Sequence, residues 1–331
     1  MGRLILPALA LAAGGLVAAA AVVEAQSQSR PPVPAPQVLQ QGELARPPDP
    51  GAYKKPKHDT PLREGTRTQG TRNVLAAWFS EPTDRYRHTP FGSPMHPATL
   101  TVSTAERRVL RLSLPKGSVF EDRAPRIVDI DGDGKDEIVV IRAYERTGAA
   151  LAIVAQRGAE LEIIAETPPI GTAHRWLNPA GFADFNGDGK LDIALVETPH
   201  IRGELQFWTM RGGRLEQIAS TDDVSNHVYG SLHLKLSAVA DFNGDGIDDL
   251  ALPSQDRRRL RFFTLAGGKL NELGEADLPG PAGEDFEVVV VGGKPAVRVG
   301  LMGGRHVTIA PCRDISDWEM AKGRCCGAVG W

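Results

Sequence analysis

Residues 184–192 read Asp-Phe-Asn-Gly-Asp-Gly-Lys-Leu-Asp, and this stretch decides how the chain folds. The underlying pattern is Asp, any residue, Asp or Asn, Gly, Asp, Gly, any two residues, and then Asp or Glu. It occurs again at residues 129–137 and 241–249, so the first residues of successive copies lie 55 and 57 positions apart. Recurrence at such a period indicates structural repeats built around a shared core.

Each copy places oxygen-bearing side chains at alternate positions, and carboxylates crowded in this way repel one another unless a cation compensates them. Calcium fits because it takes about six to eight oxygen ligands in a flexible shell. We expect side-chain oxygens from positions one, three and five, the backbone carbonyl of position seven and the carboxylate of position nine, with two glycines permitting the turn. The candidate ligands are Asp129, Asp131, Asp133, Lys135 and Glu137 (loop one), Asp184, Asn186, Asp188, Lys190 and Asp192 (loop two), and Asp241, Asn243, Asp245, Ile247 and Asp249 (loop three).

The predicted metal is structural. Three calcium ions would set six positive charges against the ten carboxylates among these ligands. Magnesium fits less well because it demands a strict octahedron. No nucleophile with an adjacent base accompanies the loops, so a Lewis-acid role lacks its other parts. The alternative is an acidic Asp-Gly turn without metal, which three copies at nearly constant spacing disfavour.

An EF-hand begins with similar alternating ligands, but the loops differ from it in two respects. An EF-hand requires a bidentate Glu at position twelve, where this chain has Val140, Leu195 and Leu252. Its flanks are helices, whereas the segments that follow these loops are short apolar runs typical of buried strands. The sequence therefore excludes an EF-hand.

The repeat continues beyond each loop with three strand-like segments, the last two joined by a glycine turn. These segments are 138–141, 151–154 and 161–164 after loop one, 193–196, 205–208 and 215–218 after loop two, and 250–252, 260–263 and 270–273 after loop three. With a short strand entering each loop, a repeat has four antiparallel strands, as a propeller blade does. Residues 109–117 and 297–307 match the strand and turn that end a blade, so we predict an all-β propeller of about five four-stranded blades over residues 71–311, three of them with calcium loops.

Residues 128–138, 183–193 and 240–250 resemble the FG-GAP or VCBS repeats of integrin α-like β-propellers. The resemblance extends over roughly residues 71–311. It implies calcium in loops between the first and second strands of a blade, a secreted or surface location, and roles in adhesion or in binding carbohydrate or protein. These three segments lack the Phe-Gly and Gly-Ala-Pro elements that name the repeat, so an integrin-like ligand is not implied.

The N-terminus has the pattern of a secretory signal. Arg3 precedes an apolar stretch over residues 4–23, and Val23-Glu24-Ala25 suits cleavage after Ala25. We therefore expect a signal peptide over residues 1–25 and a secreted or periplasmic protein; the alternative is an uncleaved membrane anchor. Residues 26–70 are rich in Pro and Gln and are predicted to form a disordered linker.

The charge composition bears on which macromolecules the protein could bind. The chain has 38 Lys and Arg against 41 Asp and Glu, a net charge of −3, so no general positive field favours nucleic acid. Its 36 glycines and 25 prolines favour a fold with many turns over a helical bundle. Residues 257–261, with four arginines, are a possible local basic patch for an anionic glycan or a membrane surface.

The end of the blades opposite the calcium loops collects groups suited to recognition. They are Tyr144, Glu145, Arg146, His174, Arg175, Trp176, His200, Ile201, Arg202, His227, Tyr229, Arg257, Arg258 and Arg259. We predict a protein or glycan ligand on this rim. The alternative is that long polar connections expose such side chains without binding anything.

The favoured function is non-catalytic binding, because no GxSxG, HExxH or paired-carboxylate motif is present outside the metal loops. The alternative is a polysaccharide lyase or hydrolase on the rim, which a cluster of His174, His200 and Tyr229 in a pocket would favour. The tail, residues 312–331, carries the three cysteines of the chain. In an oxidising compartment Cys312 is expected to pair with Cys325 or Cys326.

Overall fold

The computed structural model describes residues 65–311 and 327–328, which form β-strands and turns with one short 3-10 helix, η1 (Ala266–Gly268). The first sheet contains β1 (Thr68–Gln69), β2 (Val74–Thr83), β3 (His96–Thr104) and β4 (Val109–Ser113). The second contains β5 (Ser118–Phe120), β6 (Arg126–Val128), β7 (Glu137–Tyr144), β8 (Gly148–Arg157) and β9 (Glu160–Glu166). The third contains β10 (Leu177–Ala183), β11 (Asp192–Glu197), β12 (Glu204–Arg211) and β13 (Arg214–Thr221).

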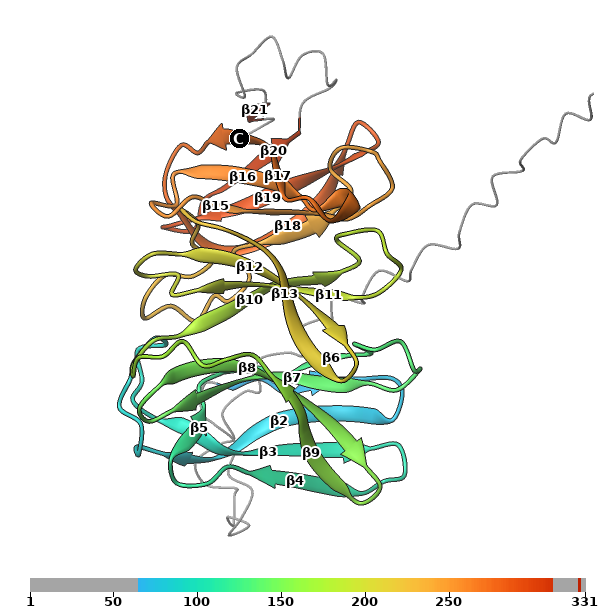
Figure 1. The fold of residues 1–331 in the computed structure, drawn as a ribbon. Coiled ribbons are helices and arrows are strands. Elements are labelled where there is room, and N and C mark those ends of the chain that lie inside the picture. Colours follow the sequence, from blue (N-terminus) through green and yellow to red (C-terminus); the bar gives the residue numbers. More distant parts are fainter. Residues whose placement is uncertain (1–64, 312–326, 329–331) are drawn as a thin grey trace, which may run out of the picture. The chain divides into compact units, whose positions relative to one another are not determined.

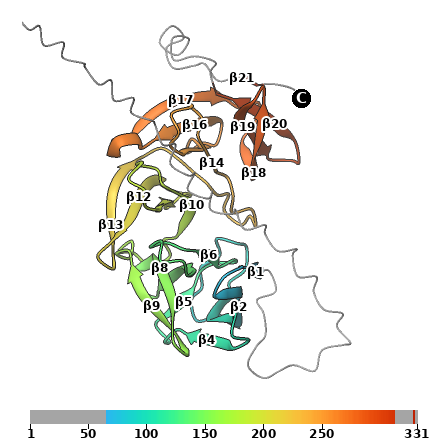
Figure 2. The same ribbon diagram turned by 90° about the vertical axis from the view of Figure 1, so that its right-hand side faces the viewer.

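Two more sheets complete the described fold. The fourth contains β14 (Ala238–Ala240), β15 (Asp249–Pro253), β16 (Arg259–Thr264) and β17 (Asn271–Asp277). The fifth contains β18 (Ala282–Val291), β19 (Lys294–Leu301), β20 (His306–Ala310) and β21 (Gly327–Ala328). In every sheet the strands are antiparallel and follow chain order, except that β5 and β6 both pair with β7 (Figures 1 and 2).

Successive sheets pack face to face through apolar side chains. Between the third and fourth sheets, Phe207 packs with Leu250 and Phe263, each at most 2% exposed. Similar clusters join the first sheet to the second, the second to the third and the fourth to the fifth. Consecutive antiparallel sheets that pack face to face, each on the next, form a propeller-like architecture.

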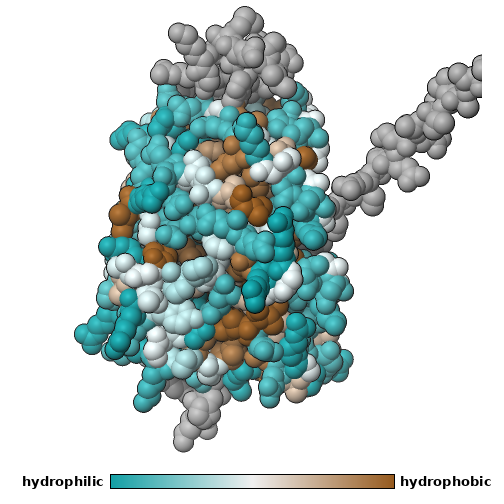
Figure 3. All heavy atoms as spheres, viewed as in Figure 1, coloured by the Kyte–Doolittle hydropathy of each residue, from teal (hydrophilic) through white to brown (hydrophobic). Residues whose placement is uncertain are grey.

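Position within a sheet explains the composition of each strand. The middle strands β7 and β8 are apolar almost throughout because both of their faces are covered by neighbouring sheets. The last strand β13 is mostly polar and exposed. On the face drawn in Figure 3, hydrophobic patches are separated by hydrophilic side chains. None of the helices in the described residues is long and apolar enough to cross a lipid bilayer.

The innermost strands of the second and fourth sheets are interrupted. Residues 121–125 separate β5 from β6, although both strands pair with β7. In the fourth sheet Val224 forms an isolated bridge with Ser254, and residues 225–237 intervene before β14. Both interruptions are irregular segments, residues 121–125 and 225–237, and they lie toward the end of the sheets where the first strands begin.

A tight turn after β11 depends on one glycine. Gly203 has a φ of 66°, and a Cβ there would lie 1.7 Å from the carbonyl oxygen of Val224. The Gly203 N–H donates to the carbonyl of Thr198, which closes a turn that contains His200. Only glycine permits this close approach of two sheet connections.

The expected strands after each acidic loop are confirmed as β7 to β9, β11 to β13 and β15 to β17. The last sheet differs by one strand, since residues 297–307 form its second and third strands instead of ending it. The first strand begins at Thr68, inside the segment 26–70 predicted as a linker, because Thr68 pairs with Ala77 and donates to the carbonyl of Pro125. The signal peptide and the cysteines lie outside the described residues.

Candidate functional site

The three acidic loops occupy equivalent places. Loop one joins β6 to β7, loop two joins β10 to β11, and loop three joins β14 to β15. The second residue of each loop points into the core, with Ile130, Phe185 and Phe242 at most 4% exposed. The rings of Phe185 and Phe207 lie 5.1 Å apart and nearly perpendicular, and Phe242 contacts Phe262 in the same way at 5.1 Å. These ring contacts fix loops two and three to the third strands of their own sheets, β12 and β16, while Ile130 of loop one joins the apolar cluster between the second and third sheets.

The backbone of each loop folds around its first aspartate. The N–H of the second loop glycine donates to that carboxylate in all three loops, with distances of 3.0 Å for Gly134 to Asp129, 2.7 Å for Gly189 to Asp184 and 2.9 Å for Gly246 to Asp241. Both loop glycines have positive φ in every copy. In each loop the fifth residue also accepts the backbone N–H of the seventh, at 2.8–2.9 Å, so the three loops share one backbone conformation.

The carboxylates at position nine are buried. Glu137 is 5% exposed, and Asp192 and Asp249 are fully buried. Burial, with a smaller contribution from neighbouring loop carboxylates, raises the pKa of Glu137 to about 7, of Asp192 to about 6 and of Asp249 to about 7. A nearby cation would reverse these shifts.

Four buried oxygens in the loops have no hydrogen-bond partner: Oδ1 of Asp129, Oδ1 and Oδ2 of Asp192, and Oδ1 of Asp249. In loop one, oxygens of Asp129, Asp131 and Glu137 all lie within 4.8 Å of one another. Uncompensated buried carboxylate oxygens in such proximity fit a hard divalent cation with oxygen ligands. Three of the predicted ligands of loop one are thus brought together, and for loops two and three the same convergence stays a prediction.

The first sheet has no acidic loop between β1 and β2, and its turn instead contacts loop one. Nη1 of Arg72 lies 2.6 Å from Oδ2 of Asp129 and 3.5 Å from Oδ1 of Asp136. Asn73 exchanges hydrogen bonds with the backbone of Asp136. Loop one, the copy with four ligand carboxylates, therefore already receives one positive charge from a neighbouring sheet.

At the opposite end of the sheets a second set of functional side chains converges. We call it the histidine cluster: Tyr86, His88, Glu121, His174, Trp176, His200, His227 and Tyr229. Its members come from the β2–β3 connection, the interruption between β5 and β6, the β9–β10 connection, the β11–β12 turn and the segment before β14. Five separate connections therefore build one site.

Trp176 is the buried centre of the histidine cluster. Its ring stacks on His200 at 5.8 Å with an interplanar angle of 8°, and it meets the His227 ring at 4.8 Å. Its Nε1–H donates to the backbone carbonyl of Glu121 over 2.9 Å. Tyr229, 54% exposed, covers the outside, with its ring 5.2 Å from His200 and 6.3 Å from His88.

His88 is held by a buried carboxyl group. Its Nδ1 lies 2.5 Å from Oε1 of Glu121, a residue with no exposed surface. Burial raises the pKa of Glu121 to about 8, while burial and then the charge of Arg175 lower the pKa of His88 to about 4. Oε2 of Glu121 has no hydrogen-bond partner. The contact fixes the orientation of the His88 ring and leaves its second nitrogen, Nε2, available for a hydrogen bond to a ligand.

His200 and His227 form the second pair, with Nε2 of His200 lying 2.7 Å from Nδ1 of His227. Nε2 of His227 faces the carbonyl oxygen of Ser231 at 3.1 Å. The carbonyl accepts only a proton-bearing nitrogen, so Nδ1 of His227 is the acceptor and Nε2 of His200 the donor. Burial lowers the pKa of His200 to about 4 and of His227 to about 3, so both rings are neutral at pH 7.

We expect His227 to make folding sensitive to acid. Its pKa falls from 6.5 in the unfolded chain to about 3, so between these pH values only the unfolded state binds the proton. The stabilising contribution is therefore complete above pH 6.5 and decreases by about 1.4 kcal/mol per pH unit on acidification. The groups around the ring are His200, Trp176, Phe91 and the Ser231 carbonyl, with the charges of Arg123 and Arg257.

The measurement is urea unfolding of the wild type and His227→Gln from pH 6.5 to pH 4. The stability advantage of the wild type over the variant should shrink by about 1.4 kcal/mol per pH unit. The exposed His233, substituted by Gln, is the control and should leave the pH dependence unchanged. A constant difference between wild type and His227→Gln would contradict the expectation.

The FG-GAP-like repeat family matches residues 129–195 and 184–252. Each match begins at the first aspartate of an acidic loop and ends in the second strand of the following sheet. The chain contains FG-GAP-like repeats. The resemblance predicted from the three loops is thereby confirmed. No curated protein matches the chain.

Several solved structures are similar in fold to this FG-GAP repeat chain. Exotype rhamnogalacturonan lyase YesX shares 15% identity at a TM-score of 0.40, over 77% of this chain and 57% of the lyase. Rhamnogalacturonan lyase PL11 of Bacillus licheniformis shares 12% identity at a TM-score of 0.39, over 84% of this chain and 67% of the lyase. Sqt1 of Saccharomyces cerevisiae shares 11% identity at a TM-score of 0.42, over 78% of this chain and 65% of Sqt1. The chain thus spans little more than half the length of the first of these proteins.

Five of the fourteen predicted rim residues belong to the histidine cluster, namely His174, Trp176, His200, His227 and Tyr229. Tyr144 does not belong to it. Its hydroxyl donates to Glu166 over 2.7 Å, and Arg142 stacks on its ring. Tyr86, His88 and Glu121 were not predicted as site residues. The available signal was the charged run Glu121-Asp122-Arg123 directly after an apolar strand, which is unusual for a sheet interior.

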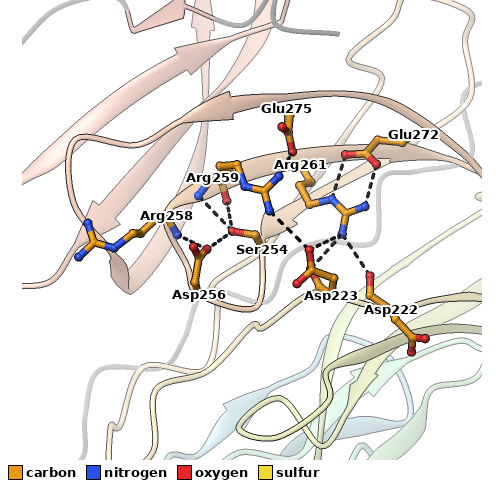
Figure 4. Close-up of polar contacts among 9 residues, drawn as sticks. All are labelled: Asp222, Asp223, Ser254, Asp256, Arg258, Arg259, Arg261, Glu272 and Glu275. Carbon is orange, nitrogen blue, oxygen red and sulfur yellow. Dashed lines mark hydrogen bonds and ion pairs between the residues drawn. The ribbon is translucent and has the colours of Figure 1, made fainter.

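The proposed basic patch at residues 257–261 is largely neutralised (Figure 4). Arg259 lies 2.6 Å from Glu275 and 3.5 Å from Asp223, and Arg261 lies 2.7 Å from Glu272. The Ser254 hydroxyl donates to Asp256, which also accepts the N–H of Arg258. Arg259 and Arg261 are thus paired within the fold, and an anionic partner for this run stays a prediction.

Proposed function

We propose that this FG-GAP repeat protein is a calcium-stabilised propeller of five four-stranded blades that binds a protein or glycan outside the cytoplasm. The observation that carries the proposal is the convergence of five sheet connections on the histidine cluster, at the end of the sheets opposite the acidic loops. Aromatic and imidazole rings combine apolar faces with hydrogen-bonding edges, which suits a recognition surface.

Calcium is proposed for all three loops, held by the fifteen residues named from the sequence. When bound, it would neutralise loop carboxylates whose buried oxygens otherwise lack a partner. The ligands belong to segments that join the first and second strands, so the ion would stabilise the sheets. About three structural ions per chain are expected.

The proposed location is the periplasm or the extracellular medium, which follows from the signal sequence over residues 1–25 with cleavage after Ala25. Residues 26–70 would then link the folded part to the mature N-terminus, except that β1 belongs to the fold. Contact with a membrane is proposed only if the apolar segment is not cleaved. Nucleic acid is not a proposed partner.

The proposal is tested by a glycan and protein binding screen with and without calcium. Wild type should bind at least one ligand class, and His174→Ala and Tyr229→Ala, which remove exposed rings of the histidine cluster, should weaken binding at least tenfold. The control is His306→Ala, an exposed histidine in β20. Binding that survives both cluster substitutions would place the ligand elsewhere and contradict the proposal.

A second candidate is an enzyme acting on polysaccharide, and the buried Glu121–His88 contact favours it. A histidine fixed by a carboxyl group, with its second nitrogen available and a tyrosine ring nearby, has the parts of an acid–base pair. The Tyr229 hydroxyl, however, hydrogen-bonds to Thr89 rather than to a histidine. Release of new chain ends from a polysaccharide by wild type, abolished in His88→Gln, would support this candidate.

A further inference from the structure

The charges around the histidine cluster do not balance. Glu121 is buried and favoured in its neutral form, and Asp122 contacts the guanidinium of Arg126. The histidine pairs are neutral at pH 7. The neighbouring arginines Arg175 and Arg257 remain charged, so this end of the sheets carries an excess of positive charge.

Arg175 and Arg257 differ in their partners from the arginines of the fold that form ion pairs. Within residues 65–311, neither lies within ion-pair distance of a carboxylate, whereas Arg72, Arg126, Arg142, Arg259 and Arg261 all do. Arg175 donates to the backbone carbonyl of His174, and Arg257 donates to the carbonyl of Ala282. Backbone carbonyls orient a guanidinium without neutralising it, so its charge remains available to an anion.

Both arginines lie on segments that adjoin the cluster. Arg175 follows His174 and precedes Trp176 in the chain. Gln255, two residues before Arg257, donates from Nε2 to the carbonyl oxygen of Pro199 over 3.0 Å, which places this turn beside His200. In keeping with this, the charge of Arg175 contributes to lowering the pKa of His88, and the charge of Arg257 does the same for His200 and His227. His174 and Tyr229 are the exposed rings of the cluster. A ligand lying over these rings would meet one guanidinium near His88 and another near His200.

We propose that the histidine cluster binds an acidic glycan, with sugar rings against His174 and Tyr229 and carboxylates directed to Arg175 and Arg257. This inference rests on the proposed function and narrows it to one ligand class. A sugar carries hydroxyl groups that Nε2 of His88 can meet, and Glu121 acts as a positioning residue that fixes the His88 ring. Two guanidinium groups beside neutral hydrogen-bonding rings match a repeating unit of carboxylate and hydroxyl groups.

The experiment measures binding of trigalacturonate and of its methyl ester by calorimetry at pH 7 in excess calcium. The two ligands offer the same sugar rings and differ in charge. The acid should bind at least tenfold more tightly than the ester, and its affinity should fall as salt is raised. Arg175→Ala and Arg257→Ala should each weaken binding of the acid at least tenfold while leaving the ester within twofold.

Arg258→Ala is the matched control, because Arg258 adjoins Arg257 and is exposed, and its affinity should stay within twofold of wild type. Arg257→Lys keeps the charge and should retain the preference for the acid, which separates a charge effect from a folding defect. Equal binding of acid and ester, or equal competition by hexaglutamate, would overturn the inference while leaving a binding function intact. Absence of any ligand in the wider screen would instead overturn the proposed function.

Discussion

Removal of calcium is expected to lower the melting temperature of this protein by more than about 15 °C. A site that binds only the folded state contributes about 2.7 kcal/mol when free calcium is about 100 times the Kd, hence about 8 kcal/mol for three loops. A domain of this size shifts its midpoint by about 2–4 °C per kcal/mol. The physical reason is that ten loop carboxylates, three of them buried, repel one another without the ion.

The measurement is a thermal melt in excess EGTA, repeated after calcium is restored, with magnesium in a parallel sample. Calcium should recover the full midpoint and magnesium only part of it. Metal analysis should find about three calcium ions in wild type and one fewer in Asp241→Asn, whose substitution alters the central carboxylate of loop three. Asp84→Asn, at an exposed aspartate in the β2–β3 connection, is the control. An identical transition in EGTA and in calcium would refute the calcium proposal.

Replacement of Asp122 by Ala should cost about 3–5 kcal/mol, the largest loss expected from a single side chain. Asp122 is fully buried and contacts the guanidinium of Arg126. It also accepts the backbone N–H groups of Arg123 and Ile141, at 2.8 and 3.2 Å. Between β5 and β6, where no strand pairs with β7, the Asp122 carboxylate accepts the hydrogen bond of a β7 backbone N–H, that of Ile141. The substitution would leave a buried charge and unpaired N–H groups.

Urea unfolding in calcium tests this expectation. Asp122→Asn keeps one acceptor oxygen and should cost less than Asp122→Ala. Adding Arg126→Leu to Asp122→Ala removes the orphaned charge and should recover part of the loss, because breaking one partner of a buried pair is worse than removing both. A cost below about 1 kcal/mol for Asp122→Ala would show that water satisfies the same groups.

The middle three sheets could be predicted from sequence because each contains an acidic loop, which directly precedes β7, β11 or β15. That loop marks the strand boundaries, so β7, β11 and β15 were found directly after it. The fifth sheet has no such loop, and its turns at residues 292–293 and 303–304 both contain two glycines. Identical turn residues at opposite ends of a sheet do not distinguish first from second strands, which explains the error of one strand.

Only some residues of the histidine cluster could be predicted from the sequence. His174, His200, His227 and Tyr229 follow repeat strands, so their end of the sheet could be deduced. His88 lies in a connection of the first sheet, which has no repeat signature. Glu121 is a carboxyl group without exposed surface, and a charged residue next to a strand normally indicates solvent exposure. Long-range pairing, such as that of His88 with Glu121, depends on how the sheets pack.

The acidic loops and the histidine cluster occupy opposite ends of the same strands. β10, for example, begins beside Trp176 and ends at loop two. Evolution can therefore alter the connections at one end without disturbing the acidic loops at the other. Relatives of this protein should diverge in ligand preference while keeping their loops nearly invariant, so that one durable scaffold accommodates many different specificities.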